Sequence, residues 1–264
     1  MVGAALARFF ALQHIDVRVY DPPKGKDDVA VLRDAEMIFV CVPTPFHLDG
    51  SGFDDRFLRA AIEAIPAQGK IIVIKSTVVP GTTDRLQAAY PQHRFLFNPE
   101  FLTEATADKD MQEPNRQILG TTETSATDSE SVLRLLPRAP FERIVSARTA
   151  EMVKYFCNAF YALKVAYANQ IYDMCERVGA TYDDVRRCVE TEPMVGATHL
   201  QVVHKGYRGY GGKCLPKDTR AIIQIADALG VDLTLLKAAE AYNNDLVAGQ
   251  GMDVQWPDGS PKKE

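Results

Sequence analysis

The chain has 264 residues, of which 46% are hydrophobic and 25% charged, and its formal net charge is -5 at pH 7. This length and composition suit one large domain or two smaller ones with ample core material. The mild acidity argues against a nucleic-acid partner or an anionic membrane surface. No apolar stretch is long enough to span a bilayer, and the first residues do not form a secretory signal.

Five cysteines are spread along the chain without a Cys-x-x-Cys pair. An odd number of cysteines fits a reducing compartment better than a disulfide framework, so we expect a cytoplasmic protein. The histidines are also scattered, and the closest pair, His199 and His204, would not share a helix face. The sequence therefore shows no metal site.

The first segment has half of the pattern of a dinucleotide-binding unit. Residues 3–12 predict a short apolar helix, and residues 15–20 alternate like a strand that ends at Asp21. A complete unit runs strand, Gly-x-Gly-x-x-Gly, helix, strand, and then an acid for the adenosine ribose. By register Gly3 matches the third glycine and Asp21 the acid, although a lone Asp after a strand is usually a turn former. The first strand and the first two glycines are absent.

Apolar runs further along the chain predict a sheet. Residues 37–42, 71–74 and 95–97 have the length of buried parallel strands, and residues 54–65 read as a helix between the first two. Alternating strands and helices predict a doubly wound, Rossmann-like α/β fold. In such a fold ligands bind beyond the carboxyl ends of the strands.

The residues that follow the first two of these strands are candidates for cofactor binding. Their hydroxyls and exposed amides suit a cofactor's ribose or phosphate, and ordinary turn chemistry is the alternative interpretation. The candidates are Pro43, Thr44, Ser76 and Thr77.

The second half of the chain predicts helices. Residues 114–120 would form the last strand of the first domain, and apolar residues then recur at helical spacing over 148–178. A helix of this length can link two domains. Lys154 and Asn158 share one face of it, so an ammonium and a carboxamide could point at one substrate.

Shorter helices at 182–190 and 235–244 complete an all-α region. We therefore expect a nucleotide-binding domain over residues 1–145, a helical domain over 146–248, and a polar, disordered tail over 249–264.

The most informative stretch is a glycine-rich loop before another helix. Four glycines between residues 206 and 212 let the backbone bend sharply or approach a ligand closely. Pro216 marks the helix start, so Cys214 falls at the helix N-terminus. There the free amides, the helix dipole and the cations of Lys213 and Lys217 favour a thiolate, which is a nucleophile. The alternative is a small buried hydrophobe, the usual fate of a free cysteine.

Several motifs resemble those of the UDP-glucose and GDP-mannose dehydrogenase family. Gly-Tyr-Gly-Gly-Lys-Cys-Leu-Pro-Lys-Asp, at residues 209–218, resembles the family's active-site cysteine motif. Asn-Pro-Glu-Phe-Leu, at 98–102, resembles a second signature, and Glu151 to Lys154 with Asn158 resembles a third. The resemblance covers most of the chain, although the family's third, nucleotide-gripping domain is missing.

The resemblance implies a four-electron oxidation with NAD as cofactor. A nucleotide sugar, with UDP-glucose as the first choice, would be oxidised at C6 to an aldehyde, which Cys214 would attack to form a thiohemiacetal. A second oxidation would give a thioester, and hydrolysis would release the uronic acid. Lys154 and Asn158 would stabilise oxyanions, while Asp218 and Glu104, with Thr77, would position and deprotonate water.

The resemblance also implies the binding residues and a homodimer built on the long helix. The cofactor would contact Gly3, Asp21, Pro43, Thr44, Ser76, Thr77, Glu104 and Lys217, and the substrate Phe101, Leu102, Lys154, Asn158, Tyr210, Gly211 and Gly212.

The chain departs from the family pattern at two places. Ala105 stands where the family usually has Gly, and Met194 stands where it commonly has an Arg for the substrate phosphate. Arg208 is a candidate to replace that guanidinium. One alternative function is a catalytically impaired relative that binds sugar nucleotides or a partner. A β-hydroxyacid dehydrogenase is a weaker alternative because it needs no cysteine.

Overall fold

The computed structural model describes residues 1–255, which form two compact units. The first contains Met1–Pro45 and Asp54–Lys154, and the second contains Phe46–Phe53 and the chain from Tyr155 onward. The chain therefore passes between the units three times, at residues 45–46, 53–54 and 154–155. Within the described residues no helix is both long enough and apolar enough to cross a membrane.

A five-stranded sheet forms the centre of the first unit, with the strand order β1-β4-β5-β6-β7. β1 pairs with β4, β4 with β5 and β6 with β7 in parallel, whereas β5 and β6 are antiparallel. The sheet is thus mixed rather than wholly parallel. The strands are β1 (Met37–Val40), β4 (Ile71–Ile74), β5 (Arg94–Phe97), β6 (Gln117–Thr121) and β7 (Glu142–Ser146).

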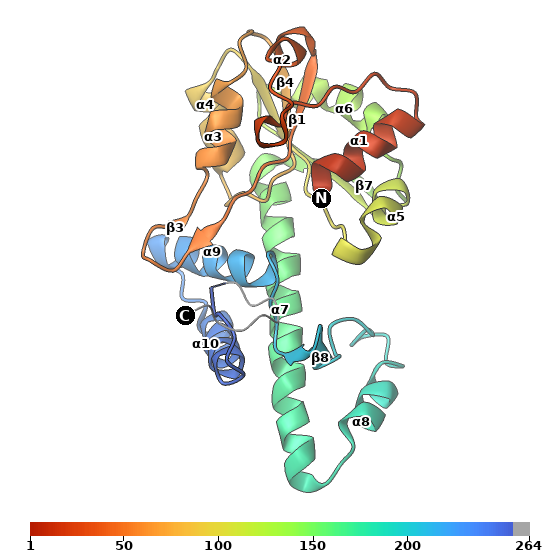
Figure 1. The fold of residues 1–264 in the computed structure, drawn as a ribbon, viewed down its shortest axis with the longest axis vertical. Helices are drawn as coiled ribbons and strands as arrows, with labels where there is room; N and C mark the ends of the chain where they lie inside the picture. Colours follow the sequence, from red (N-terminus) through yellow and green to blue (C-terminus); the bar gives the residue numbers. More distant parts are fainter. Residues whose placement is uncertain (256–264) are drawn as a thin grey trace. The chain divides into compact units, whose positions relative to one another are not determined.

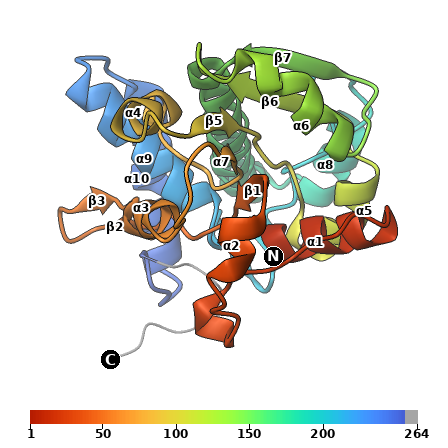
Figure 2. The ribbon, with the colours of Figure 1, turned by 90° about the horizontal axis from the view of Figure 1, so that it is seen from above.

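Both faces of this sheet are covered, as expected for a doubly wound fold. Successive strand residues point to opposite faces, so Ile71 and Val73 lie on one side and Ile72 and Ile74 on the other, all buried. Figures 1 and 2 show α1 and α5 on one side of the strands and α3 and α4 on the other. The helices of this unit are α1 (Val2–Leu12), α2 (Ala30–Asp34), α3 (Arg56–Glu63), α4 (Thr82–Ala89), α5 (Ala107–Gln112) and α6 (Ser129–Leu135), with 3-10 turns η1 (Pro22–Lys24), η2 (Glu104–Thr106) and η3 (Ala126–Asp128).

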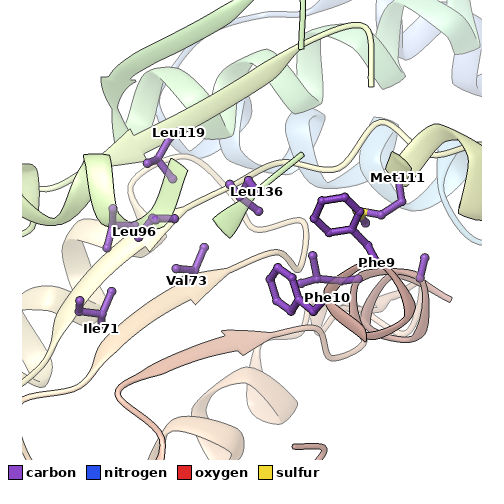
Figure 3. Close-up of a cluster of buried hydrophobic side chains, with 11 residues drawn as sticks. Phe9, Phe10, Ile71, Val73, Leu96, Met111, Leu119 and Leu136 are labelled. Carbon is purple, nitrogen blue, oxygen red and sulfur yellow. The ribbon is translucent and has the colours of Figure 1, made fainter. Parts of the chain in front are cut away.

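The face covered by α1 and α5 carries the main apolar cluster of the unit. Phe9 and Phe10 of α1 and Met111 of α5 pack over Val73 and Leu96 of the sheet, as seen in Figure 3. The expected helix at 3–12 is confirmed. Its apolar residues, which gave the prediction, form the face that packs on the sheet.

The expected strand at residues 15–20 is wrong. These residues have no strand assignment, although Ile15 and Val17 turn inward and pack against the apolar cluster. The alternation is therefore real, but a strand also needs a neighbour to pair with. Among the described residues β1 is the edge of the sheet, and no ladder reaches beyond it.

The sheet of the first unit has one more strand than expected. Strand β6 is not the last strand, because β7 follows it and pairs along its whole length. Glycine 120 on β6 lies against the next helix so closely that an added Cβ would be 2.8 Å from both Ala147 Cα and Ala150 Cβ. This residue must stay without a side chain for that helix to dock on the sheet.

Helix α7 (Ala147–Val178) is the long helix expected from the apolar spacing, and it continues from the first unit into the second. The second unit is otherwise made of helices and two short hairpins, so its expected all-α character holds apart from the hairpins. Its further elements are α8 (Tyr182–Val189), α9 (Leu215–Ala228), α10 (Thr234–Ala248), β2 (Phe46–His47), β3 (Gly52–Phe53), β8 (Val203–His204) and β9 (Tyr207–Arg208).

The segment after α10 is packed, in contrast to the expected disordered tail. Met252 is buried against Tyr207 and Val247. The Gln255 side chain donates to Phe46 O at 2.6 Å and accepts from Leu48 N at 2.9 Å, which fastens the β2–β3 hairpin. The polar composition of this segment suggested disorder, but Gln255 forms hydrogen bonds to backbone groups of the hairpin segment. Residues 256–264 of the expected tail lie outside the described residues.

Candidate active site

Lys154 is buried in the first unit, where it is held by the loop that follows β5. Its Nζ donates to Glu100 O at 2.7 Å and lies 3.1 Å from Glu100 Oε1, and both side chains are less than one-tenth exposed. The ammonium also lies 5.6 Å from the centre of the Phe101 ring, over which Arg116 stacks at 3.9 Å. Two of the predicted site residues, Lys154 and Phe101, are therefore brought together.

A buried polar network supports the start of the same loop. Lys75 Nζ donates to Asn98 Oδ1, and Asn98 Nδ2 donates to Gln117 Oε1 and to Ile118 O. Burial lowers the pKa of Lys75 because desolvation disfavours the charged ammonium. Burial likewise raises the pKa of the Cys41 thiol to about 11, which makes this thiol a poor candidate nucleophile.

A cavity of about 220 Å³ adjoins this network, within the first unit. Its walls come from the loop after β5 and from the segment that leads into β6. They include Lys75, Glu100, Phe101, Leu102 and Arg116.

The hydroxyls of two predicted cofactor residues at the strand ends are used in bonds within the protein. Thr44 Oγ1 donates to Thr77 O at 2.7 Å, and Ser76 Oγ accepts from Val42 N and donates to Val42 O, each at 2.8 Å. These bonds tie the loop after β1 to the loop after β4. Thr44 and Ser76 are buried, Thr77 is partly exposed and Pro43 is exposed. The hydroxyls of Thr44 and Ser76 thus hold the two loops together, while Pro43 and Thr77 keep some exposed surface.

Gly3, at the start of α1, is packed closely against the segment that ends β1. An added Cβ on Gly3 would lie 3.1 Å from Cys41 Cβ, so the start of α1 approaches the end of β1 very closely. Close packing of helix and strand is the role of the third fingerprint glycine, and Gly3 fits it. The carboxylate of Asp21, the expected ribose acid, accepts instead from Lys24 Nζ at 2.7 Å.

Glu104 lies at the first position of η2 and is exposed, whereas Leu102 is half-buried against the main apolar cluster. The Leu102 amide donates to Glu100 Oε2 at 2.8 Å, so the loop is braced from within.

In the second unit, Cys214 is the N-cap residue of α9, and Pro216 is the second residue of that helix. The cysteine is exposed and forms no disulfide. The interpretation of Cys214 as a buried hydrophobe is therefore wrong. A helix amino end presents free N–H groups and positive potential, which favour an anionic sulfur at this position.

Asp218 lies one turn into α9 and is almost completely buried. It accepts from Asn158 Nδ2 at 2.5 Å and forms an ion pair with Lys217. Three predicted residues from two helices thus form one connected group. The partners compensate for burying a carboxylate, which would be unfavourable alone.

The glycine loop itself is anchored by a core tyrosine. Tyr210 is 2% exposed, its OH donates to Glu240 Oε2 at 2.5 Å, and burial raises its pKa. Its side chain therefore serves the core, while Gly211 and Gly212 are partly exposed and Lys213 is exposed. Gly212 has a φ of 72°, a conformation that favours glycine.

Arg208 does not offer a guanidinium in place of the one lost at Met194. It donates to Asn169 Oδ1 at 3.0 Å and to Asp173 Oδ1 at 2.7 Å, and it stacks over the Tyr172 ring. Met194 is 95% exposed. Arg208 therefore braces the β8–β9 hairpin against α7.

Comparisons with known proteins match both units. Residues 23–136 match the NAD binding domain of the UDP-glucose/GDP-mannose dehydrogenase family, and residues 148–245 match its central domain. The chain belongs to the UDP-glucose/GDP-mannose dehydrogenase family. The matched ranges contain Thr77, Glu104, Lys154 and Cys214, whereas Gly3 and Asp21 precede them.

Individual members of the family resemble the chain over most of its length. A UDP-glucose 6-dehydrogenase of Pseudomonas aeruginosa is 39% identical over 231 residues, 80% of this chain and 49% of that protein. UDP-glucose 6-dehydrogenase YwqF of Bacillus subtilis is 35% identical over 81% of this chain and 50% of its own length. The chain thus spans about half the length of these curated relatives.

Solved structures give the same family. A UDP-glucose dehydrogenase from Pyrobaculum islandicum has a TM-score of 0.71 and 27% identity, over 94% of this chain and 63% of that one. The structure of a UDP-D-ManNAc dehydrogenase from Pyrococcus horikoshii has a TM-score of 0.78 at 24% identity, over 94% and 67%, and supports the fold.

Some features of the candidate site could not have been found from motifs alone. Glu100 holds Lys154, Arg116 covers Phe101, and Glu151 is a fully buried carboxylate. Glu100 and Glu151 stand inside the motifs that identified their neighbours, which was the available signal.

Proposed function

We propose that the chain carries out NAD-dependent oxidation of the C6 hydroxyl of a nucleotide sugar, with UDP-glucose as the preferred substrate and UDP-glucuronate as the product. The observation that carries this proposal is the exposed Cys214 at the amino end of α9. Asp218, one turn later on the same helix, is buried and accepts a hydrogen bond from Asn158 of α7. The names of the relatives support the substrate class.

NAD, when bound, accepts one hydride from C6, so the two successive oxidations consume two NAD for each sugar. In the proposed reaction the first oxidation yields an aldehyde, and the Cys214 sulfur forms a C–S bond to its carbon. Loss of the second hydride from the resulting thiohemiacetal gives a thioester, and water then breaks the C–S bond and returns the thiol. A thiolate suits both steps because it attacks an aldehyde and also leaves readily from a thioester.

Within this proposal the other predicted residues keep separate tasks. Lys154 and Asn158 stabilise the negative oxygen of the tetrahedral species. Asp218, with Glu104 and Thr77, orients and deprotonates the hydrolytic water. Pro43, Thr44, Ser76, Thr77 and Lys217 shape the cofactor's surroundings, and Gly211 and Gly212 let the substrate approach the backbone. We place the reaction in the cytoplasm, since none of the five cysteines forms a disulfide.

The experiment follows NADH formation by the purified protein with NAD and a panel of UDP- and GDP-sugars. We expect the parent to form two NADH per UDP-glucose. The Cys214→Ser variant should not form the second NADH. Cys188→Ser is the matched control, because Cys188 is also exposed but lies on α8. A Cys214→Ser protein that completes both oxidations at the parental rate would falsify the covalent route. Folded protein that oxidises no sugar would favour the impaired, binding-only relative.

We further propose that the protein is a homodimer that pairs through α7. In the second unit Phe156, Phe160, Tyr167 and Met174 are each at least half exposed, and the first two rings stack at 6.2 Å. They recur at helical spacing and form one apolar stripe. Sedimentation should show dimers for the parent and monomers for Phe156→Glu. Leu229→Glu, at an equally exposed residue outside the stripe, should stay dimeric, and a dimeric Phe156→Glu would refute this interface.

A further inference from the structure

Glu151 is a carboxylate with no exposed surface, and none of the roles described so far uses it. It lies on α7, three residues before Lys154, so the two side chains leave neighbouring turns of the same face. Burial raises its pKa above the ordinary value, which means that its charged form is held at some cost. A carboxylate in such a place calls for an explanation.

The carboxylate binds the amino end of α4. It accepts from Gly81 N at 2.5 Å, from Thr83 N at 2.8 Å and from Thr83 Oγ1 at 2.6 Å. Gly81 is the N-cap residue of α4 and has no side chain that could cap the helix. The cap that other helices obtain from their own Ser, Thr or Asp is here supplied by α7.

This cap fixes the end of a functional loop. The loop runs from Ser76 to Pro80, with Thr77 inside it, and is tied at its start by the two bonds between Ser76 and Val42. Its other end is fixed by the hydrogen bond from the Gly81 amide to the Glu151 carboxylate. Thr77 therefore lies between two anchors, one on the strand β1 side and one on α7.

The part of α7 that carries Glu151 is itself firmly docked in the first unit. Gly120 allows β6 to touch Ala147 and Ala150, and Arg148 pairs with Asp84 of α4 at 2.7 Å. One turn further, Lys154 is bonded to Glu100. The carboxylate also occupies the place where an anionic ligand would bind to the amino end of α4, so that end serves structure and not phosphate binding.

We propose that Glu151 is a positioning residue of the site, which fixes the loop that carries Thr77 to the turn of α7 that carries Lys154. The inference rests on the proposed function for its meaning in catalysis, but its effect on NAD binding does not need turnover.

The test is Glu151→Gln. The new side chain keeps an oxygen for Thr83, but its NH2 group faces the Gly81 N–H, donor against donor. Asp84→Asn is the matched control, because it breaks another α4–α7 contact and leaves the loop amides untouched. The measurements are hydrogen exchange at the Gly81 and Thr83 amides, the dissociation constant for NAD without sugar, and kcat and KM.

For Glu151→Gln we expect amide exchange at Gly81 to be about tenfold faster and the NAD dissociation constant to rise about five- to tenfold, as for loss of a helix cap. Asp84→Asn should change both by less than about twofold, as an exposed ion pair does. If Glu151→Gln does not fold, Thr83→Val removes only the hydroxyl bond and should act in the same direction by about twofold.

Faster exchange at Gly81 with unchanged NAD affinity would overturn the proposal, because Glu151 would then be a structural cap alone. Unchanged exchange, or parental protein that does not bind NAD at millimolar concentration, would overturn it as well. If the parent binds NAD but oxidises no sugar, the proposed function fails, while weaker NAD binding by Glu151→Gln still supports the positioning role.

Discussion

The two units hold their candidate catalytic groups in different ways. In the first, Lys154 is buried and bonded to a loop carbonyl and a carboxylate of Glu100. In the second, Asn158 and Lys217 hold the buried Asp218, while Cys214 stays exposed at a helix end. The charged groups are thus fixed by partners, whereas the candidate nucleophile, Cys214, is exposed. Fixed charges stabilise a transition state because they need not reorganise, and a nucleophile must reach its substrate.

The largest effect is expected for Arg220→Met in the second unit. Arg220 is 5% exposed, pairs with Glu240 at 2.5 Å and donates to Val254 O at 2.8 Å. Its loss would leave the Glu240 carboxylate without its cation and release the C-terminal segment. We expect a loss of about 3–5 kcal/mol in the free energy of unfolding, measured with urea. A stability within about 1 kcal/mol of the parent would show that this network does not support the unit.

Lys154→Met tests the fixed charge in the first unit. We expect kcat for NADH formation to fall about 10²- to 10³-fold, because the developing oxyanion loses its partner. Lys164→Met is the control, since Lys164 lies on the same helix but donates to the carbonyl of Val195. Equal losses in the two variants would contradict the special role of Lys154.

Gly120→Ala tests how tightly α7 is docked on β6. The new methyl group would lie 2.8 Å from Ala147 Cα, a backbone atom that cannot rotate away. We expect a destabilisation of about 1–3 kcal/mol, read from thermal unfolding. An unchanged melting temperature would mean that α7 can shift away from the sheet at little cost.

The smallest effect is a pH dependence that comes from Glu151. Because its pKa is raised in the folded protein, its favourable contribution to stability is present below the ordinary value of 4.5 and is lost as pH rises through the raised value. Burial is the main cause, and Asp84 adds to it. The melting temperature of the parent relative to Glu151→Gln should therefore fall as pH rises from 4 upward. Glu130→Gln, at an exposed residue, should give a flat difference.

Local pattern was enough for the elements that bury a continuous apolar surface. Strand β4 was predicted with its observed bounds because Ile71 to Ile74 are all apolar and β-branched, and the helical spacing on α7 gave its length. Strand β7 was missed because most of its residues are exposed and its first two residues are charged. Both features are common in a strand at the edge of a sheet. Residues 15–20 show the opposite case. Their alternating pattern is typical of a strand, but they form none because no neighbouring strand in the described part of the chain pairs with them.

For the site, motifs supplied the residues and only the fold supplied their partners. The position of Cys214 could be inferred from Pro216 and the glycines, because a helix start is a local event. The bond between Asn158 and Asp218 joins positions 60 residues apart, and the cap from Glu151 to Gly81 joins positions 70 apart. No periodicity reports such pairs.

The β2–β3 hairpin belongs to the second unit although it is encoded within the first. Gln224 accepts from its Phe53 amide at 3.2 Å, and Gln255 holds its other strand. A fragment that starts at α7 would therefore lack the β2–β3 hairpin that its own residues bind. A fragment that ends before α7 would contain this hairpin without its binding partners. The chain crosses between the units three times, so no single cleavage yields two self-sufficient pieces, and we expect that proteolytic dissection will require three cuts to separate them.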